Sequence, residues 1–318
     1  MQVVRGIPTQ ADRPAVLTIG NFDGVHRGHQ ALLKLLTDKA RALGLPAVVL
    51  TFEPHPREYF APADAPARLA SMREKLLLLE ACGVDRVHVC RFDKAFAAQP
   101  ASGFIDDFLV RGLAVRHLFI GDDFCFGARR QGNFAMLQQA GLSHGFGVES
   151  MTTLSVAGER VSSSAVRDAL ATGDLDHAAR LLGRPYSIAG RVVHGDKLGR
   201  QLGFPTANIQ LKHRRPALAG VFAVRVEGLG ERSIDGVANI GIRPTATDIP
   251  RPRLEVHLFD WSEPCYDAHL RVHFLHKLRD EQKFASLDAL TAQIRRDAEA
   301  ARAWLAQNPT PNSTGPEA

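Results

Sequence analysis

Short apolar runs alternate with segments of helical periodicity in the first half of the chain. Residues 15–19 (AVLTI) and 47–52 (AVVLTF) are almost continuously apolar, which is typical of strands buried on both faces of a parallel sheet. Over residues 30–43, leucines and alanines recur on one helical stripe, and Gly44 follows where a helix C-cap belongs. This alternation predicts a parallel sheet with helices on both faces. Further strands are expected over 86–91, 115–120 and 148–154, and further helices over 72–82, 103–111, 133–140, 163–171 and 175–182.

After about residue 183 the pattern changes to β-rich runs without crossover helices. Glycines and prolines punctuate these runs, and their spacing predicts a small antiparallel barrel. A helix expected over 286–306 closes this part, and the tail 307–318 is expected to be disordered. The sequence therefore predicts a first domain over 1–183 and a second over 184–306. The β-rich runs are 186–193, 220–227, 233–240, 253–259 and 269–275.

Composition excludes several classes of protein. Of the 318 residues, 45% are hydrophobic and 23% are charged, as in an ordinary globular protein, and the net charge is only +5. No stretch is apolar for long enough to span a membrane, and the first residues lack the apolar segment of a secretory signal. Four cysteines without CxxC spacing are typical of free thiols in a reducing cytoplasm. The basic cluster 212–215 is expected to be a solvated loop, so a nucleic acid is not an expected partner. A membrane is not an expected partner either, because the chain lacks an apolar span.

A glycine-rich turn separates the first buried strand from the helix that follows it. The glycines of GNFDGVHRGH, residues 20–29, allow the backbone to approach a ligand closely, and a helix N-terminus supplies free N–H groups and a partial positive charge. His26 and His29 flank Gly28, where two imidazoles can donate hydrogen bonds to phosphate oxygens as negative charge develops. A metal site is a weaker interpretation, because the two histidines lack a third ligand nearby.

A second anion-binding pattern stands near the end of this half. Ser162, Ser163 and Ser164 precede a predicted helix as N-cap residues, and Arg167 lies one turn inside it, where it can neutralise a pyrophosphate. Alone, the serines indicate only a helix N-cap. Together, HxGH at a strand-to-helix turn and a later serine-rich turn resemble the nucleotidyltransferase superfamily, relatives of the class I aminoacyl-tRNA synthetases. This resemblance implies a Rossmann-like α/β fold with a parallel sheet for the first half.

Two further segments make the resemblance more specific. TFEPHP over 51–56 and GDDFCFG over 121–127 follow predicted strands, at the sheet edge where such folds bind ligands. With GNFDGVHRGH they resemble the FMN adenylyltransferase module of the bacterial bifunctional riboflavin kinase/FAD synthetase family. The resemblance implies that the phosphate of FMN attacks the α-phosphorus of ATP and that pyrophosphate leaves. Cys125 stands where the family often has Arg or another polar residue, and Asn133 stands where Asp is common.

The same resemblance assigns residues of the first half to two ligands. It implies that His26 and His29 bind the ATP phosphates and the adenylyl transition state, and that Asp123 lies by ATP and its metal. The set implied at ATP is Gly20, Asn21, Phe22, Gly24, His26, His29, Asp123, Ser162, Ser163, Ser164 and Arg167, and the set implied at the flavin is Phe52, Pro54 and Pro56.

The segment GRVVHGDKLGRQLGFPTAN, residues 190–208, is the most specific of the second half. Its glycines and Lys197 can hold phosphates through backbone N–H groups and charge, although the GxxxxGK[ST] pattern of a Walker A loop is absent. Thr206 and Asn208 are two residues apart and so point to one face of an extended segment. There, their oxygens can coordinate Mg²⁺ and orient ATP. Taken alone, PTAN favours a structural turn.

The whole segment resembles the riboflavin kinase domain of the same family. NIGIRPT over 239–245, LEVHL over 254–258 and LRDEQKF over 278–284 agree with this resemblance, whereas Cys265-Tyr266-Asp267 stands where the family commonly has Leu-Tyr-Gly, and the loop 245–250 is also unusual. The implied fold is a small antiparallel barrel with a C-terminal helix. The residues implied at ATP are Gly195, Lys197, Leu198, Gly199, Thr206 and Asn208, the last two with Mg²⁺, and those implied at the flavin are Arg279 and Glu281.

Alternation within LEVHL separates two kinds of residue. Leu254, Val256 and Leu258 share one face of the predicted strand, and Glu255 and His257 share the other. A glutamate on the inner face of a small barrel is costly unless it is paired or used. By the resemblance, Glu255 is the general base that takes the proton from the riboflavin 5′-hydroxyl. For His257, we expect a structural role.

We therefore expect a bifunctional enzyme whose partners are riboflavin, FMN, FAD and ATP. It converts riboflavin to FMN and FMN to FAD, with ATP as co-substrate and Mg²⁺ as cofactor. Alternative interpretations are a nucleotidyltransferase that makes a nicotinamide or pantetheine cofactor, a flavin- or nucleotide-binding regulator with one decayed site, and a nucleic-acid-binding protein. The kinase-like half argues against the first alternative, and the presence of the expected catalytic residues argues against the second. The sequence predicts no oligomeric state.

Overall fold

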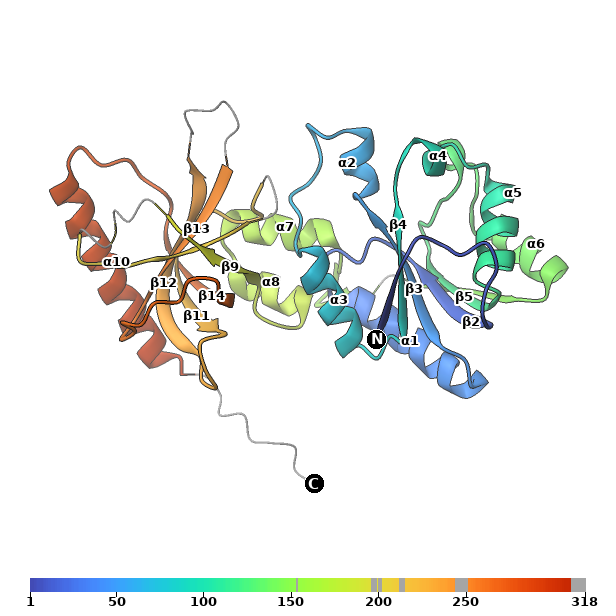
Figure 1. Cartoon of the computed structure of the whole chain (residues 1–318), viewed down its shortest axis with the longest axis horizontal. Coiled ribbons are helices and arrows are strands. Elements are labelled where there is room, and N and C mark those ends of the chain that lie inside the picture. The colour runs from blue at the N-terminus through green and yellow to red at the C-terminus, as the bar shows by residue number, and fades with distance from the viewer. Residues whose placement is uncertain (153, 196–198, 200–201, 212–214, 244–250, 310–318) are drawn as a thin grey trace, which may run out of the picture. The chain divides into compact units, whose positions relative to one another are not determined.

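The computed structural model divides the chain into two compact units (Figure 1). Helices after the serine-rich turn group with the barrel by their contacts, so the compact units do not divide at residue 183. The expected functional boundary between 183 and 184 stays a prediction. The units are Met1–Pro66 with Met72–Ser163, and Ala67–Ser71 with Ser164–Ala318. The structure describes all residues except 153, 196–198, 200–201, 212–214, 244–250 and 310–318, so most of the tail expected to be disordered lies outside the described residues.

The first unit contains a six-stranded parallel sheet in the order β1–β4–β3–β2–β5–β6. All residues of β2 are buried, as its apolar run predicts. The chain moves outward from β2 in one direction and then returns to its other side at β5, so the strand order reverses between β2 and β5. The strands are β1 (Gln2–Arg5), β2 (Ala15–Ile19), β3 (Ala47–Glu53), β4 (Arg86–Arg91), β5 (Val115–Gly121) and β6 (Gly147–Met151).

The sequence predicted five of these strands and missed β1. This short edge strand is mostly exposed and pairs only with β4, so it has no apolar run to reveal it. A hairpin of β7 (Ser155–Val156) and β8 (Glu159–Arg160) was also not predicted, and the strand expected over 148–154 ends earlier, at Met151.

Helices cover both faces of the sheet, as predicted. Alternate residues of the central strands divide between two apolar clusters, with Val16 facing one and Leu17 the other. Gly44 has a φ of 64° and ends α1, which confirms the predicted C-cap. The segment expected as a helix over 103–111 is a π-helix, η1. The helical segments are α1 (Arg27–Leu43), α2 (Pro56–Phe60), α3 (Met72–Ala81), α4 (Lys94–Ala97), α5 (Ala101–Gly103), η1 (Phe104–Gly112), η2 (Ala128–Arg130) and α6 (Phe134–His144).

The second unit is a closed antiparallel barrel in the order β10–β13–β12–β11–β14–β9. The predicted barrel is confirmed, but β10 was not recognised as one of its strands because it is only 3 residues long. The elements are α7 (Ser163–Thr172), α8 (Leu175–Leu182), β9 (Ser187–Val193), β10 (Ala207–Ile209), β11 (Gly220–Glu227), β12 (Ile234–Arg243), β13 (Arg251–Leu258), β14 (His269–Arg279) and α10 (Leu287–Gln307).

Strand register identifies the inner and outer faces of the barrel. Residues directly opposed on antiparallel strands project to the same face. Helix α10 packs on Val221, Ala223 and Val237, so their face is the outer one (Figure 1). The intervening residues, such as Phe222 and Val256, are fully buried and fill the interior.

Glu255 lies on the outer face, because it is in register with Asn239 on β12, which is itself opposed to Val221 on β11. The expectation that Glu255 points into the barrel is therefore wrong. The leucines and valine of LEVHL are the inward residues, and they are buried. A closed six-stranded barrel has an interior that its own side chains fill, so a polar group that meets a ligand belongs outside.

Replacing Phe222 with alanine is expected to destabilise the barrel unit by about 3–5 kcal/mol, because a fully buried aromatic ring that contacts Phe274 is lost. Both tryptophans, Trp261 and Trp304, belong to this unit, so urea unfolding followed by tryptophan fluorescence reports on it selectively. The control Leu287→Ala removes a side chain that is 58% exposed and should change stability by less than about 0.5 kcal/mol. Equal unfolding midpoints for both variants would contradict the assignment of the inner face.

Candidate active sites

The glycine-rich turn lies at the carboxyl end of β2, where the strand order of the sheet reverses. In open parallel sheets, ligands bind at such switch points. Helix α1 begins at Arg27, directly after His26, and so points its N-terminus into this region. The structure therefore places the predicted phosphate-binding residues at the position that the fold favours for a ligand.

His26 is the N-cap residue of α1. Its Nδ1 accepts a hydrogen bond from the backbone N–H of His29 at 3.3 Å. A ring nitrogen that accepts carries no proton, so this contact places the proton of a neutral His26 on Nε2. His26 is only 6% exposed, and its ring stacks on that of His29 with 3.7 Å between the ring centroids. Helix capping thus fixes both the position and the tautomer of the first histidine.

His29 is held in its neutral form. Burial, the neighbouring His26 and the charge of Lys75 keep the pKa of His29 well below its ordinary value. Its Nδ1 is buried and has no hydrogen-bond partner among the described residues. A buried polar atom without a partner is uncommon in folded proteins. A ligand that offers a complementary group would satisfy it.

Lys75 is a residue of this site that the sequence analysis missed. It lies on α3 and is only 5% exposed, which is rare for a lysine. Its helix packs into the same apolar cluster as Phe22 and Val25 of the glycine-rich turn. In the sequence, Lys75 is one of several charged residues in a predicted helix, so no local pattern could have identified it.

The structure brings part of the serine-rich turn to the glycine-rich turn. The Ser163 hydroxyl donates a hydrogen bond to the carbonyl of Asp23 at 2.9 Å. A Cβ on Gly28 would lie 3.4 Å from the carbonyl oxygen of Val161, so the two turns are in contact. Ser164 and Arg167 belong to the second unit, where Arg167 Nε donates to the Ala67 carbonyl at 2.6 Å.

Asp123 follows β5 and is paired with an arginine that was not predicted. Arg160 on β8 lies 3.1 Å from Asp123 and 3.9 Å from Asp122. Asp123 is largely exposed, so this pair is accessible to solvent and ligands. The unpredicted hairpin brings the arginine to the acidic turn, which explains why the sequence pattern did not reveal the pair.

Phe52, expected at the flavin, belongs to a cluster of aromatic rings. Its centroid lies 5.9 Å from that of Phe92 and 5.4 Å from that of Phe96. Pro56 is the first residue of α2, whose exposed Phe60 contacts Phe92 as well. Flat aromatic surfaces of this kind suit a planar aromatic ligand. The structure thus surrounds Phe52 with rings that the sequence analysis did not single out.

In the barrel unit, glycines pack against the predicted ATP residues. A Cβ on Gly195 would lie 2.3–2.6 Å from the side-chain amide of Asn208, and one on Gly199 would lie 3.3 Å from the Thr206 hydroxyl. Only glycine therefore allows the backbone to approach Asn208 so closely. Lys197 and Leu198, also predicted at ATP, lie outside the described residues.

His257 holds the PTAN segment against the barrel. Its Nδ1 donates to the Pro205 carbonyl at 2.8 Å, because a carbonyl can only accept. Its ring also meets Phe204 edge to face at 5.5 Å. These contacts agree with a structural role for His257.

Glu255 is opposed to Asn208 on one side and to Asn239 on the other. All three side chains share the outer face of the barrel, and neighbouring strands are about 4.8 Å apart. The carboxylate of Glu281 also approaches this face, since a Cβ on Gly241 would lie within 2.0 Å of it. The register of three strands thus assembles polar groups that lie far apart in the sequence.

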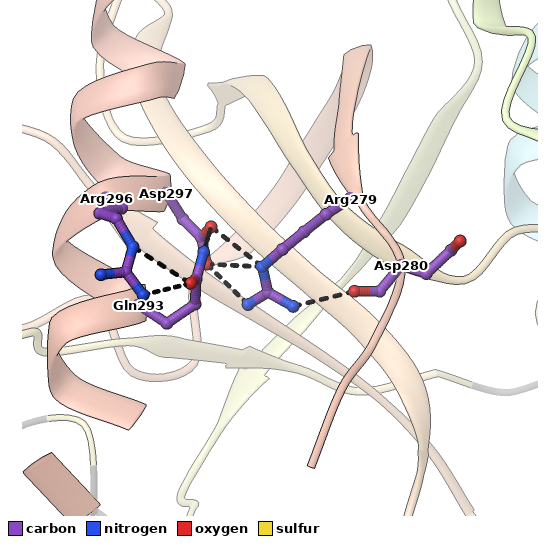
Figure 2. A network of polar contacts seen from close by, with 5 residues as sticks. All are labelled: Arg279, Asp280, Gln293, Arg296 and Asp297. Carbon is purple, nitrogen blue, oxygen red and sulfur yellow. Dashed lines mark hydrogen bonds and ion pairs between the residues drawn. The ribbon is translucent and has the colours of Figure 1, made fainter. Parts of the chain in front are cut away.

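Arg279 connects the end of β14 to α10 (Figure 2). Its Nε and Nη2 donate to Asp297 at 3.0 and 2.7 Å, and Nη1 donates to the Asp280 carbonyl at 2.9 Å. Gln293 on α10 donates to Asp297 at 2.8 Å and accepts from Arg296. The described contacts of Arg279 therefore anchor the C-terminal helix, and its predicted position at the flavin stays a prediction.

Comparisons with known proteins agree with the two-part organisation. The family model described as FAD synthetase matches residues 8–165, and the model described as riboflavin kinase matches residues 182–305. The bifunctional riboflavin kinase/FMN adenylyltransferase of Escherichia coli strain K12 is 53% identical over 96% of this chain and 98% of its own. The proteins with the same description from Pseudomonas fluorescens and Haemophilus influenzae are 53% and 50% identical, over 96% of this chain and 98% and 99% of theirs.

A solved structure supports the fold of the whole chain. The crystal structure of a protein described as a macrolide-efflux protein from Streptococcus pneumoniae has a TM-score of 0.81 and 28% identity, and the match covers 96% of this chain and 100% of that one. None of the helices in the described part of the present chain combines the length and apolar composition that crossing a membrane requires.

Replacing Lys75 with methionine is expected to raise the pKa of His29, because a nearby positive charge disfavours the protonated imidazole. NMR titration of ¹³C-labelled histidine measures this pKa, and the spectrum of a His29→Gln variant assigns the signal. Lys34→Met is the matched control, since Lys34 is 75% exposed and pairs with Asp38. An unchanged His29 titration in Lys75→Met would show that Lys75 does not act on this imidazole.

Replacing Asp297 with alanine is expected to destabilise the barrel unit by about 2–3 kcal/mol, because Arg279 loses its partner in a largely buried position. Arg279→Lys should destabilise it as well, since lysine lacks the planar fork that pairs with a carboxylate at two points. Urea unfolding followed by tryptophan fluorescence measures both effects. Glu299→Ala, at an exposed position of the same helix, is the control and should leave the midpoint unchanged.

Proposed function

The chain belongs to the family of bifunctional riboflavin kinase/FMN adenylyltransferases, and we propose which of its own residues carry each reaction. The protein phosphorylates riboflavin to FMN with ATP and then adenylylates FMN to FAD with release of pyrophosphate. The two family models assign FAD synthesis to the first half and riboflavin phosphorylation to the second. A functional boundary between residues 183 and 184 is part of the proposal.

In the kinase reaction, Glu255 takes the proton from the 5′-hydroxyl of riboflavin. The 5′-oxygen then forms a bond to the γ-phosphorus of ATP while the bond from that phosphorus to the bridging oxygen of ADP breaks. Thr206 and Asn208 orient ATP, with Gly195, Lys197, Leu198 and Gly199 around its phosphates. The observation that carries this assignment is the register that opposes Glu255 to Asn208 on the outer face of the barrel.

Thr206 and Asn208 offer the oxygen ligands that suit Mg²⁺. Gly195 approaches the Asn208 amide closely and Gly199 approaches Thr206, so the backbone carries no side chain where it lies against these two residues. When bound, Mg²⁺ neutralises charge on the ATP phosphates. Arg279 and Glu281 complete the proposed kinase site on the flavin side.

In the adenylyltransferase reaction, a phosphate oxygen of FMN attacks the α-phosphorus of ATP, and the bond to pyrophosphate breaks. No protein nucleophile takes part. His26 and His29 donate hydrogen bonds to the phosphates as neutral imidazoles, His26 through Nε2–H. The glycine-rich turn, Asp123, the serines of the second turn and Arg167 bind ATP, while Phe52, Pro54 and Pro56 contact the flavin.

The alternatives raised by the sequence fit less well. A nucleotidyltransferase for a nicotinamide or pantetheine cofactor does not account for the match of residues 182–305 to riboflavin kinases. A regulator with a decayed site does not account for the presence of His26 and His29 in the first unit and of Thr206, Asn208 and Glu255 in the second. We also propose that the protein works in the cytoplasm without a nucleic-acid partner, which its four free cysteines and modest net charge support.

Glu255→Gln is expected to lower FMN formation by roughly 10²- to 10⁴-fold, because the amide cannot accept the hydroxyl proton. His29→Ala is expected to lower FAD formation from supplied FMN by roughly 10²- to 10³-fold, because a donor to the transition state is lost. Chromatographic separation of flavins after incubation with MgATP measures both steps.

Each variant is the control for the other, since each should retain the step that the other loses. Loss of both steps in one variant would contradict the division of labour. A wild-type protein that forms FAD from FMN but no FMN from riboflavin would contradict the kinase assignment.

A further inference from the structure

Asn239 belongs to the row of polar side chains that contains Glu255, but nothing described so far gives it a role. It lies on β12, directly opposite Glu255 on β13, which in turn is opposite Asn208 on β10. Directly opposed residues have Cβ atoms about 5 Å apart and project to the same face. Asn239 is therefore an immediate neighbour of the proposed general base.

The side-chain oxygen of Asn239 is buried and has no hydrogen-bond partner among the described residues. Its direct neighbour on β11, Val221, is apolar and lies in the cluster under α10, so this adjacent residue offers no donor. A buried acceptor left without a donor destabilises the folded protein, because it has lost its hydrogen bonds to water. An acceptor retained at such a cost beside a catalytic group indicates that a ligand supplies the donor.

The surroundings of Asn239 indicate which chemical group is missing. Glu255 lies opposite it, and the Glu281 carboxylate lies over Gly241, two residues further along the same face of β12. Ionised carboxylates only accept hydrogen bonds. Oxygen acceptors gathered in this way suit a ligand that carries several hydroxyl donors, and the ribityl chain of riboflavin is such a group.

We propose that Asn239 binds riboflavin, its Oδ1 accepting a hydrogen bond from a hydroxyl of the ribityl chain so that the 5′-hydroxyl meets Glu255. This inference rests on the proposed kinase function of the barrel unit. It assigns the two neighbours of Glu255 to the two substrates: Asn208 faces ATP on one side, and Asn239 faces riboflavin on the other. Two strand spacings, about 10 Å, separate the two asparagines, with the proton acceptor between them.

The test compares riboflavin with lumiflavin, which has the same ring system but no ribityl chain. For each variant of the full-length protein, the KM for riboflavin is measured from the sum of FMN and FAD formed, because the first unit converts FMN to FAD. Lumiflavin is measured as a competitive inhibitor of that summed formation. Both values report on the kinase site alone. Asn239→Leu keeps the size of the side chain but removes the acceptor, and Asn239→Asp keeps an acceptor oxygen in the same place.

Asn239→Leu is expected to raise the KM for riboflavin roughly 3- to 10-fold, as for one lost hydrogen bond, and to leave the inhibition constant of lumiflavin unchanged. Asn239→Asp should retain the wild-type preference for riboflavin over lumiflavin. Asn239→Ala repeats the test should the leucine variant not fold. An unchanged KM for ATP and an unchanged unfolding midpoint show that a variant keeps its ATP site and its stability. Asn308→Ala, at an exposed position after α10, is the matched control and should change neither constant.

An unchanged riboflavin KM in the variants without an acceptor would overturn the inference. So would equal losses for riboflavin and lumiflavin, since the ring rather than the ribityl chain would then be affected. A wild-type protein that makes no FMN would instead contradict the proposed function itself, so the two failures are distinguishable.

Discussion

A closed barrel of six strands has an interior that only its own side chains can fill, and this constraint determines where the second unit can do chemistry. Phe222 and the inward residues of LEVHL occupy the interior. The strand residues proposed to meet the substrates, Asn208, Glu255 and Asn239, therefore lie on the outer face. Helix α10 covers part of that face with apolar contacts, and the row of Asn208, Glu255 and Asn239 lies beside the covered part.

The position of α10 in turn depends on polar contacts at the end of β14. Arg279 pairs with Asp297 through two nitrogens, and Gln293 holds the same carboxylate from the helix (Figure 2). Because Glu281 follows Arg279 closely in the chain, this anchor also fixes the segment that brings the Glu281 carboxylate over Gly241. Arg279, which the LRDEQKF motif led us to expect at the flavin, thus pairs with Asp297, a partner that the motif does not contain.

In the first unit, the local structure keeps two imidazoles neutral beside a phosphate-binding turn. The N-cap contact requires an unprotonated Nδ1 on His26, and stacking brings His29 against it. Burial and the charge of Lys75 both disfavour a second proton on the imidazole of His29. Helix formation, burial and a nearby cation therefore act together on one property, the protonation state of the histidine pair.

The sequence by itself determined the fold class, the order of the main elements and the two motif-bearing turns. Hydrophobic periodicity, glycine at the end of α1 and HxGH after a buried strand are local signals, which a short window of sequence contains. The sequence missed β1 and β10, because a short edge strand and a 3-residue strand carry too little pattern.

Only the tertiary structure decided that Glu255 faces outward, that Lys75 belongs to the histidine site, that Arg160 pairs with Asp123, and that Asn239 is the neighbour of Glu255. Alternation along a strand separates two faces but does not say which one is inside. Strand register and helix packing settle that question, and both depend on residues that lie far apart along the chain.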